Sequence, residues 1–544
     1  MAGDPREGRT AELDVRAGKF VERRDRSRMR IPVLTILYHP DVHRVGERLW
    51  LSSLPSGEAV GVSRLGPGFV APGESRGRPL EDPYVSRTPV HFGPGETEEA
   101  VRLSVGQSTT AVVADGEPVT GERQFRAADL RRGVVLLWAN RVVLLLHSLA
   151  PRPRREPPRF GLVGDSEGLL RVRQEIERVA DLDVPVLLRG ETGTGKELIA
   201  QALHRASLRR NQTYLSVNMG AIPSNLAAAE LFGAKKGSYT GADKNRAGYF
   251  KRADRGTLFL DEVGDAPPDV QVLLLRVLDS GEIQPVGSLE KQRVDVRVLA
   301  ATDADLEVAI DEGQFKAPLL HRLAGYAILV PPLRERRDDV GHLLVHFLRE
   351  ELERIGEGHR LEQSDPTESP WLPASIVARL ARYPWPGNVR ELRNLMRQLV
   401  IQSRGADSIR VGPQVEQVLR RAEAMPDASP QAEEDTAEQP AAPAQPKRPS
   451  YRPPSEVDED ELVAALADNR YLVKPTAQQL GVSRSSLYSL MDKSSRVRKA
   501  SELTREEIEA SLERTGGDLE ALVDELQVSG NGLQMRMKEL GIEL

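Results

Sequence analysis

The spacing of apolar residues changes several times along the chain, and each change predicts a different kind of structure. Between residues 31 and 150, turns that contain glycine or proline separate short apolar runs, which is typical of a β-sandwich. Between about 184 and 330, strand-like apolar runs alternate with helical patterns, which predicts a parallel sheet with helices on both faces. Residues 422–456 consist mainly of Ala, Pro, Glu and Gln, a composition that predicts a disordered linker.

These changes predict a multidomain chain with an all-β part, an α/β part and an all-α part. The length of 544 residues agrees with several domains. No helix is expected in the β-rich region, whose last two strands should lie within 134–150. The predicted segments are a flexible arm (1–29), a β-sandwich (30–150), a linker (151–160), an α/β domain with a helical lid (161–405), a connector with a disordered linker (406–456) and two helical units (457–500 and 501–544).

Composition narrows the setting of the protein. The net charge is −6, so any contact with nucleic acid must be local. The sequence contains no cysteine, which excludes disulfides and thiol catalysis and favours a reducing cytoplasm. Asn140, Arg141 and His147 interrupt the longest apolar stretch, which therefore indicates strands rather than a membrane span. We expect a soluble, cytoplasmic protein without membrane contact.

A glycine-rich loop follows the first apolar run of the α/β region and precedes a helical pattern. This order of strand, loop and helix is the context of a P-loop, in which backbone N–H groups surround the phosphates of ATP. Lys196 would reach the β- and γ-phosphates, and Glu197 takes the place of the usual hydroxyl ligand of Mg²⁺. The loop consists of Gly190, Glu191, Thr192, Gly193, Thr194, Gly195 and Lys196.

Two carboxylates end a later apolar strand, at residues 257–262. Their position after a P-loop predicts the Walker B arrangement. Asp261 would hold Mg²⁺, and Glu262 would orient the attacking water.

The α/β region resembles the AAA+ activators of sigma-54 RNA polymerase over nearly its whole length. The matching segments are 190–197, 230–233, 236–242, 256–262 and 385–392. The family has Gly-Ala-Phe-Thr-Gly-Ala at the tip of a mobile loop that touches sigma-54. The corresponding residues in this chain are Gly237, Ser238, Tyr239, Thr240, Gly241 and Ala242.

The resemblance implies further roles and a partner of the same kind. Asn218 would couple to Glu262, and Arg390 would contact the nucleotide from the lid. Arg322 would act as an arginine finger on the γ-phosphate of a neighbouring subunit, which implies a homo-oligomer, a hexamer in this family. Two positions depart from the family pattern: Lys316 replaces an arginine, and Asp303 replaces an asparagine. Both put the rate of hydrolysis in question.

The N-terminal β region resembles a forkhead-associated (FHA) domain, a reader of phosphothreonine. The resemblance depends on segments 61–64, 79–87 and 115–119. It implies that Arg64, Ser86 and Arg87 contact a phosphate, since guanidinium and hydroxyl groups are suitable donors. The histidine of the family is replaced by Pro89, so an FHA-like fold that binds protein without phosphate stays an alternative.

The C-terminal part repeats itself, because residues 461–466 correspond to 507–512 and 480–483 correspond to 526–529. Each copy resembles the Fis-type helix-turn-helix found at the end of many sigma-54 activators. In the first copy, base and phosphate contacts are expected from Arg484, Ser485, Ser486 and Tyr488. The second copy has two glycines in the corresponding helix and either binds DNA weakly or only packs.

Together these features predict a sigma-54-dependent activator that binds upstream DNA, hydrolyses ATP and is regulated by its N-terminal domain. The cofactors would be ATP and Mg²⁺, and the partners sigma-54 RNA polymerase, DNA and a phosphothreonine protein. The alternative is an ATP-binding, slowly hydrolysing DNA-binding or adaptor protein that does not activate the polymerase.

Overall fold

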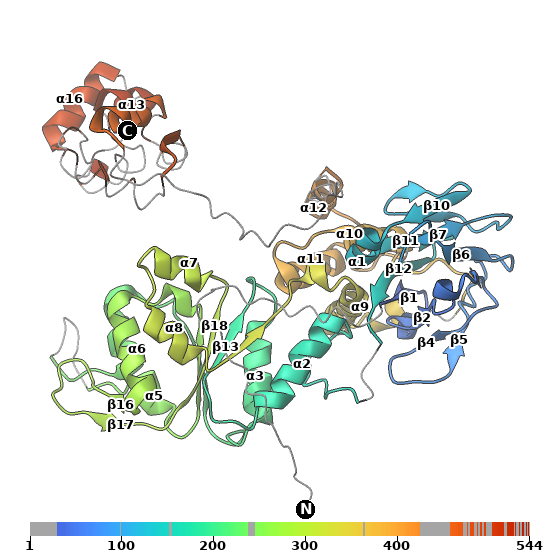
Figure 1. Cartoon of the computed structure of the whole chain (residues 1–544), viewed down its shortest axis with the longest axis horizontal. Coiled ribbons are helices and arrows are strands. Elements are labelled where there is room, and N and C mark those ends of the chain that lie inside the picture. Colours follow the sequence, from blue (N-terminus) through green and yellow to red (C-terminus); the bar gives the residue numbers. More distant parts are fainter. Residues whose placement is uncertain are drawn as a thin grey trace, which may run out of the picture. The chain divides into compact units, whose positions relative to one another are not determined.

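The computed structural model describes residues 30–424 apart from residue 98 and segments 152–154, 238–244 and 363–364. It also describes 457–469 and shorter pieces between 471 and 542. The chain forms two compact units that divide after residue 429. The first unit contains a β-domain, an α/β core and a helical lid (Figure 1).

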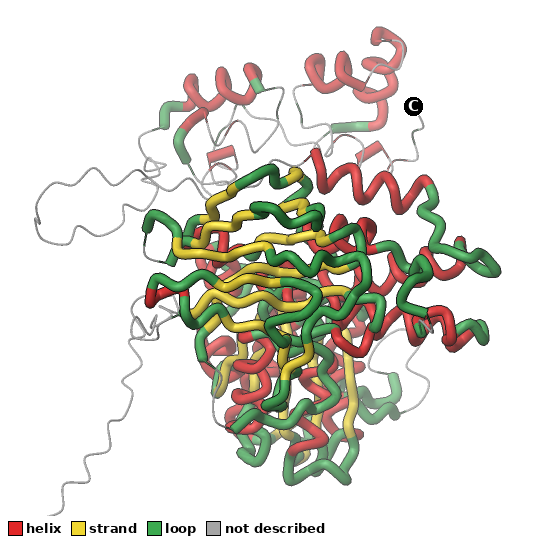
Figure 2. Tube along the Cα trace, turned by 90° about the vertical axis from the view of Figure 1, so that its right-hand side faces the viewer, coloured by secondary structure: helices red, strands yellow, loops and turns green. Residues whose placement is uncertain are grey.

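The β-domain (residues 30–150) is the predicted β-rich region, and its strands form two antiparallel sheets. The strand order is β5-β4-β2-β1-β12-β11-β8-β9 in one sheet and β10-β7-β6-β3 in the other. Figure 2 shows the strands lying side by side in layers. The strands are β1 (Ile31–Tyr38), β2 (Arg48–Trp50), β3 (Val60–Val62), β4 (Phe69–Val70), β5 (Gly77–Arg78), β6 (Val90–Pro94), β7 (Val101–Ser104), β8 (Val112–Ala114), β9 (Glu117–Pro118), β10 (Glu122–Phe125), β11 (Val134–Trp138) and β12 (Val142–Leu149).

Strand β12 shows why part of this sequence is apolar without interruption. All eight of its residues are buried. Leu144 and Leu146 belong to the core of the sandwich, where Phe92 of one sheet stacks on Trp138 of the other. Val143 and Leu145 point to the opposite face, where they pack with the lid. A strand covered on both faces has no polar alternation.

The expectation that the β region lacks helices was wrong. Helix α1 (Ala127–Arg132) precedes β11, and two 3₁₀ turns, η1 (Val42–Arg44) and η2 (Leu54–Ser56), lie earlier in the domain. The carboxylate of Asp129 accepts a hydrogen bond from the backbone N–H of Arg126, which fixes the first turn of α1. Only Leu130 of this helix is buried, so the segment shows no amphipathic period.

The α/β core (residues 161–330) has the predicted parallel sheet, with strand order β14-β15-β18-β13-β19. Its elements are α2 (Glu167–Val179), β13 (Val186–Arg189), α3 (Lys196–Ala206), β14 (Tyr214–Asn218), α4 (Ser224–Phe232), α5 (Tyr249–Arg252), β15 (Thr257–Asp261), η3 (Val263–Asp265), α6 (Pro268–Ser280), the pair β16 (Glu282–Ile283) and β17 (Gln292–Arg293), β18 (Arg297–Thr302), α7 (Leu306–Asp311), α8 (Ala317–Leu323) and β19 (Tyr326–Leu329).

Helices cover both faces of this sheet (Figure 1). Leu187 of β13 packs in a core with α4, α6 and α8, whereas its neighbours Val186 and Leu188 pack in a second core with α2 and α3. The two-residue period of a strand therefore divides the apolar residues between the two faces.

The lid (residues 333–424) extends further than the sequence predicted. It consists of η4 (Leu333–Glu335), α9 (Asp338–Arg354), η5 (Gly358–Leu361), α10 (Ala374–Arg382), α11 (Asn388–Gln402) and α12 (Pro413–Ala424). Val415 and Leu419 of α12 are buried in the same apolar core as α9, α10 and α11. The predicted end of the lid at residue 405 excluded α12. Only two apolar residues are buried among the described side chains of this helix, which lies next to a polar linker, so its sequence gives little indication of a helix.

The lid and the β-domain share one hydrophobic core. Leu37, Tyr38, Val143 and Leu145 of the β-domain pack with α9, α10 and α11. Helix α9 comes close to strand β1 because it has a glycine there: a Cβ atom on Gly341 would lie 2.2 Å from the carbonyl oxygen of Leu37. The sequence did not indicate this contact.

The second unit contains α13 (Glu459–Asp468), α16 (Arg505–Thr515) and α17 (Leu519–Leu526). Its core contains residues at corresponding positions of the sequence repeat, such as Leu462 with Ile508 and Leu487 with Leu533. The two copies therefore contribute to one apolar core. Arg484, Ser485, Ser486 and Tyr488 lie outside the described residues.

Candidate nucleotide-binding site

The predicted P-loop connects the carboxyl end of β13 to the first residue of α3. Gly193 and Gly195 have φ angles of +80° and +102°, a region that favours glycine. A Cβ atom on Gly193 would lie 2.4 Å from the carbonyl oxygen of Gly387, so the lid also requires glycine at this position. The loop thus directs backbone N–H groups and the start of a helix toward one region, which suits phosphate.

Lys196 lies in this loop and is buried. Its Nζ atom donates hydrogen bonds to the carbonyl oxygens of Gly190 (2.5 Å) and Glu191 (3.1 Å). Burial lowers the pKa of Lys196, and the nearby carboxylates of Asp303, Asp261 and Glu262 oppose this shift. The lysine and these carboxylates therefore lie in one region at the carboxyl edge of the sheet, where ligands bind in such folds.

The two Walker B carboxylates lie at the end of β15. Burial raises the pKa of Asp261, and Lys196 opposes this shift. Glu262 has a φ angle of +54°, an unusual conformation for a residue with a side chain. Strained backbone of this kind is often found at functional positions. Asp261 offers the oxygen ligand that Mg²⁺ prefers, so the residues present fit an ATP-bound magnesium ion. No group of three or more potential metal ligands occurs among the described residues.

Asn218 lies near Glu262, as the resemblance implied. It ends β14, the strand next to β15, and its Oδ1 atom accepts a hydrogen bond from the N–H of Ala221 (3.1 Å). A Cβ atom on Gly220 would lie 2.9 Å from an oxygen of Glu262 and 3.4 Å from Oδ1 of Asn218. Both side chains thus border the same small space, although their coupling stays a prediction.

Asp303 faces the P-loop. Its carboxylate accepts a hydrogen bond from the hydroxyl of Thr192. The charge is thus partnered by a donor of the loop, and the effect of this residue on hydrolysis stays a prediction.

Arg322 does not approach the P-loop of its own chain. It lies on α8, is exposed and forms an ion pair with Asp279 of α6 (2.5 Å). Lys316 precedes the same helix. A role of Arg322 at the γ-phosphate would therefore need a neighbouring subunit. Arg390 is exposed on α11, and its backbone N–H contacts the carbonyl oxygen of Gly193 (3.3 Å).

The lid contributes contacts that the sequence reading missed. The amide of Asn388 donates hydrogen bonds to the carboxylate of Glu191 and the carbonyl oxygen of Thr192, both at 3.1 Å. Arg334 binds the carboxylate of Glu191 through two hydrogen bonds, at 2.5 and 2.8 Å. Arg336 donates to the carbonyl oxygen of Thr194 (3.0 Å). Asn388 lies in segment 385–392, which matches the family, but the resemblance assigns a role in this segment only to Arg390.

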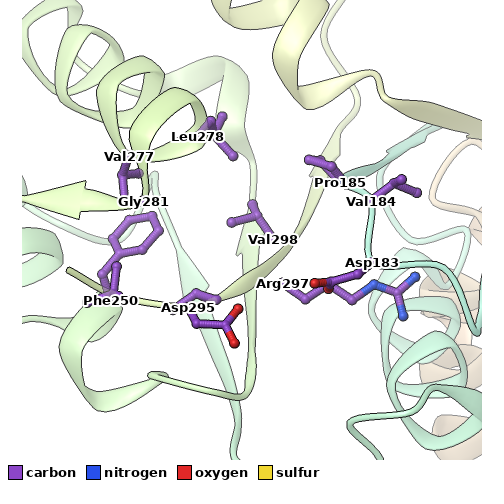
Figure 3. A pocket seen from close by; sticks show the side chains of 12 residues that line it. Asp183, Val184, Pro185, Phe250, Val277, Leu278, Gly281, Asp295, Arg297 and Val298 are labelled. Atoms are coloured by element: carbon purple, nitrogen blue, oxygen red, sulfur yellow. The ribbon is translucent and has the colours of Figure 1, made fainter.

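A cavity of about 220 Å³ lies elsewhere, and Figure 3 shows its lining. Pro185 and Arg297 in its wall lie at the amino ends of β13 and β18. The P-loop follows the carboxyl end of β13, so this cavity is not the nucleotide site.

The predicted phosphate-binding residues of the β-domain are also close together. The backbone N–H of Arg64 donates to the carbonyl oxygen of Ser86 (3.0 Å), and the guanidinium of Arg64 donates to the carbonyl oxygen of Pro83 (3.1 Å). The Ser86 hydroxyl accepts a hydrogen bond from the N–H of Thr88 (3.0 Å). Arg87 is exposed. His91 lies beside Gly61 on the neighbouring strand.

Residues 238–242 of the predicted sigma-54 contact loop (237–242) lie outside the described residues. The described base of the loop is held in place, since Ala234 and Arg246 exchange two backbone hydrogen bonds of 3.0 and 2.9 Å. Gly237 has a φ angle of +81° and is exposed.

Comparisons with known proteins identify the central part of the chain. Residues 162–329 match the sigma-54 interaction domain, and residues 334–428 match the AAA+ ATPase lid domain. The DNA-binding transcriptional regulator NtrC of Escherichia coli is 43% identical over 250 residues, which are 46% of this chain and 51% of NtrC. The regulatory protein LuxO of Vibrio cholerae is 43% identical over 243 residues, 45% of this chain and 44% of LuxO.

One matching solved structure is the crystal structure of NtrX from Brucella abortus in complex with ATP. The two sequences are 30% identical, the TM-score is 0.41, and the match covers 61% of this chain and 69% of the NtrX chain. The chain spans about half the length of the curated relatives it matches. Among the described helices, none has the length and apolar character needed to cross a membrane.

Proposed function

We propose that this chain, which carries a sigma-54 interaction domain and an AAA+ lid, is a transcription activator that uses ATP to remodel sigma-54 RNA polymerase. The observation that supports this most directly is the meeting of P-loop, Walker B carboxylates and lid at one edge of the parallel sheet. Lys196 and the P-loop N–H groups would hold the phosphates, and Asp261 would hold Mg²⁺, which supplies neutralisation of phosphate charge.

Glu262 would orient the attacking water, and Asn218 lies where it can restrain that carboxylate. Arg322 would stabilise the charge that develops on the γ-phosphate of a neighbouring subunit, which requires a homo-oligomeric ring such as a hexamer. The hydrolysis cycle would then move the loop that contains Tyr239 and Thr240. Its fixed base at Ala234 and Arg246 is suited to pass movements of the core to the tip.

The β-domain would receive the regulatory signal, and the C-terminal helical units would select the DNA site. The β-domain would bind a phosphothreonine protein through Arg64, Ser86 and Arg87, of which Arg64 and Ser86 are neighbours in space. The first helical unit would bind upstream DNA through Arg484, Ser485, Ser486 and Tyr488. The net charge of −6 confines such DNA contacts to a local patch.

In-vitro transcription with sigma-54 polymerase tests the proposal. The wild-type protein with ATP should produce open complexes, whereas Thr240→Ala should hydrolyse ATP and produce none, because only the polymerase contact is removed. Glu262→Gln should bind ATP but lose activity by about 10²- to 10⁴-fold, as expected when a carboxylate that polarises the reacting water is removed. Open complexes formed equally well by Thr240→Ala would contradict the assignment of the loop.

The same experiment separates the alternative, an ATP-binding DNA-binding or adaptor protein that hydrolyses slowly. The observation that favours it is the carboxylate of Asp303 beside the P-loop. A wild-type ATPase rate equal to that of Glu262→Gln, together with no open complexes, would support this alternative.

A further inference from the structure

A segment of six residues at the start of the lid contacts three parts of the molecule. Arg334 and Arg336 hold the P-loop through Glu191 and the carbonyl oxygen of Thr194. Arg336 is 4% exposed, so its contact is shielded from water. Residues 334–339 are called the coupling segment below.

The next two residues of the coupling segment hold the β-domain. Arg337 donates a hydrogen bond to the carbonyl oxygen of Gly133 (3.3 Å). Asp338 accepts one from Arg48 (3.0 Å), and the two side chains of this ion pair are only 7% and 6% exposed. A buried ion pair of this kind requires both partners to stay in place.

The last residue of the segment holds the α/β core. The carboxylate of Asp339 accepts hydrogen bonds from the backbone N–H groups of Asp165 (2.6 Å) and Ser166 (2.8 Å) and from the hydroxyl of Ser166 (2.6 Å). These contacts fix the segment to the start of α2. A movement of the lid relative to the P-loop therefore has to pass through residues that also hold the β-domain.

A second contact connects the lid to the predicted phosphate-binding loop, residues 79–87. Arg141 donates hydrogen bonds to the carbonyl oxygens of Pro366 and Glu368 in the lid, both at 2.7 Å. The same guanidinium pairs with Asp82 of the loop (3.3 Å) and lies 4.7 Å from the ring centre of Tyr84. The hydroxyl of Tyr84 donates to the carbonyl oxygen of Thr367 (2.8 Å).

We propose that the β-domain and the nucleotide site are coupled through the lid, with the coupling segment at one end and the Asp82–Tyr84–Arg141 cluster at the other. The inference rests on the proposed function, because it names how the β-domain regulates the ATPase. Nucleotide binding changes the P-loop residues that hold Arg334 and Arg336, and the shared apolar core carries the lid movement to the β-domain as a unit. By linkage, a ligand on the 79–87 loop changes the affinity for nucleotide by the same factor.

Hydrogen exchange of the full chain, measured by mass spectrometry with and without MgADP, tests the coupling without a peptide ligand. We expect MgADP to change the exchange rate of residues 79–87 at least fivefold, although this loop has no described contact with the P-loop. An unchanged rate in the wild-type protein would overturn the proposal.

Two variants locate the path. In Arg334→Ala, MgADP at a concentration that saturates the variant should protect the P-loop but no longer change the exchange of residues 79–87. Its matched control is Arg354→Ala, which removes another lid arginine paired with carboxylates, those of Glu350 and Glu351. Arg334 is 42% exposed, so its removal should not prevent folding. A response that persists in Arg334→Ala would overturn the assigned path.

Arg141→Ala should abolish the response at the other end of the path. The control is Arg123→Ala, since Arg123 also lies over an aromatic ring, that of Phe125, and donates to a carbonyl oxygen within the β-domain. If Arg141→Ala does not fold, the result of Arg334→Ala decides alone.

A phosphothreonine peptide library separates this inference from the proposed function. Peptide affinity should change at least fivefold when MgADP is added, and Arg334→Ala should remove this change but not the binding. If MgADP changes the exchange of residues 79–87 but no peptide binds, the β-domain does not bind phosphothreonine, and the coupling stands. If a peptide binds with the same affinity with and without MgADP, and the exchange of residues 79–87 does not respond, the β-domain binds phosphothreonine but the coupling is wrong.

Discussion

The lid has two faces that are held by different kinds of interaction. Toward the β-domain, apolar residues of α9, α10 and α11 pack against the outer face of strands β1, β11 and β12 in one shared core, and the Arg48–Asp338 ion pair is buried. Toward the P-loop, the contacts are hydrogen bonds without a shared apolar core. That of Arg336 is buried, but Arg334 and Glu191, which form two of them, are each 42% exposed. Water can replace exposed hydrogen bonds at little cost, whereas a shared core separates only with loss of apolar burial. The comparison indicates that the lid is fixed to the β-domain and adjustable at the nucleotide.

The largest expected effect comes from breaking the buried ion pair. Asp338→Ala removes the carboxylate that pairs with the buried Arg48 guanidinium, which should lower the free energy of unfolding by about 3–5 kcal/mol. Urea denaturation followed by tryptophan fluorescence measures this, because all four tryptophans (Trp50, Trp138, Trp371 and Trp385) belong to the β-domain and the lid.

The control for this variant is Arg334→Ala, which removes the exposed ion pair on the other face and should cost about 0–1 kcal/mol. Equal losses for the two variants would contradict the difference between the faces.

A smaller effect is expected from Tyr38→Phe. The Tyr38 hydroxyl donates to the carbonyl oxygen of Leu372 (2.6 Å) across the buried face, and its removal leaves that carbonyl without this donor. We expect a loss of about 1–2 kcal/mol in the same denaturation experiment. Tyr84→Phe is the matched control, because Tyr84 is 55% exposed and water can take the place of its hydroxyl. An equally large loss of stability in Tyr84→Phe would show that burial does not decide how much such a hydrogen bond contributes.

The smallest effect is a pH dependence of the β-domain. Burial lowers the pKa of His147 well below its ordinary value, and the charges of Arg48 and Arg30 lower it further. Between the folded pKa and about 6.5, the unfolded chain therefore binds more protons than the folded one, and stability falls as the pH decreases through this window.

His147→Gln should reduce the slope of stability against pH below about pH 6.5, while keeping a partner for the Thr35 hydroxyl, which now contacts Nε2 of His147 (2.8 Å). Urea titrations at pH 7.5 and pH 5.5 measure the difference. An unchanged slope would show that the pKa of His147 does not differ between the folded and the unfolded chain.

The local geometry of the candidate nucleotide site could be predicted because the residues of the P-loop are consecutive in the sequence. A loop between a strand and a helix has its geometry set locally, so Lys196 and Asp261 were placed by their neighbours alone. Asn388 and Arg334 could not be assigned in this way, because their contacts with Glu191 join residues about 140 to 200 positions apart. Helix α1 was missed because one buried leucine gives no helical period.

The sequence by itself determined the order of the parts, the parallel sheet and the P-loop, since apolar period and glycine position act over a few residues. Only the tertiary structure decided that the β-domain packs on the lid. Val143 and Leu145 look like ordinary strand residues in the sequence. They face the lid because a strand presents alternate residues on opposite faces of its sheet. Gly341 lets α9 come close enough to cover the face that does not belong to the core of the sandwich.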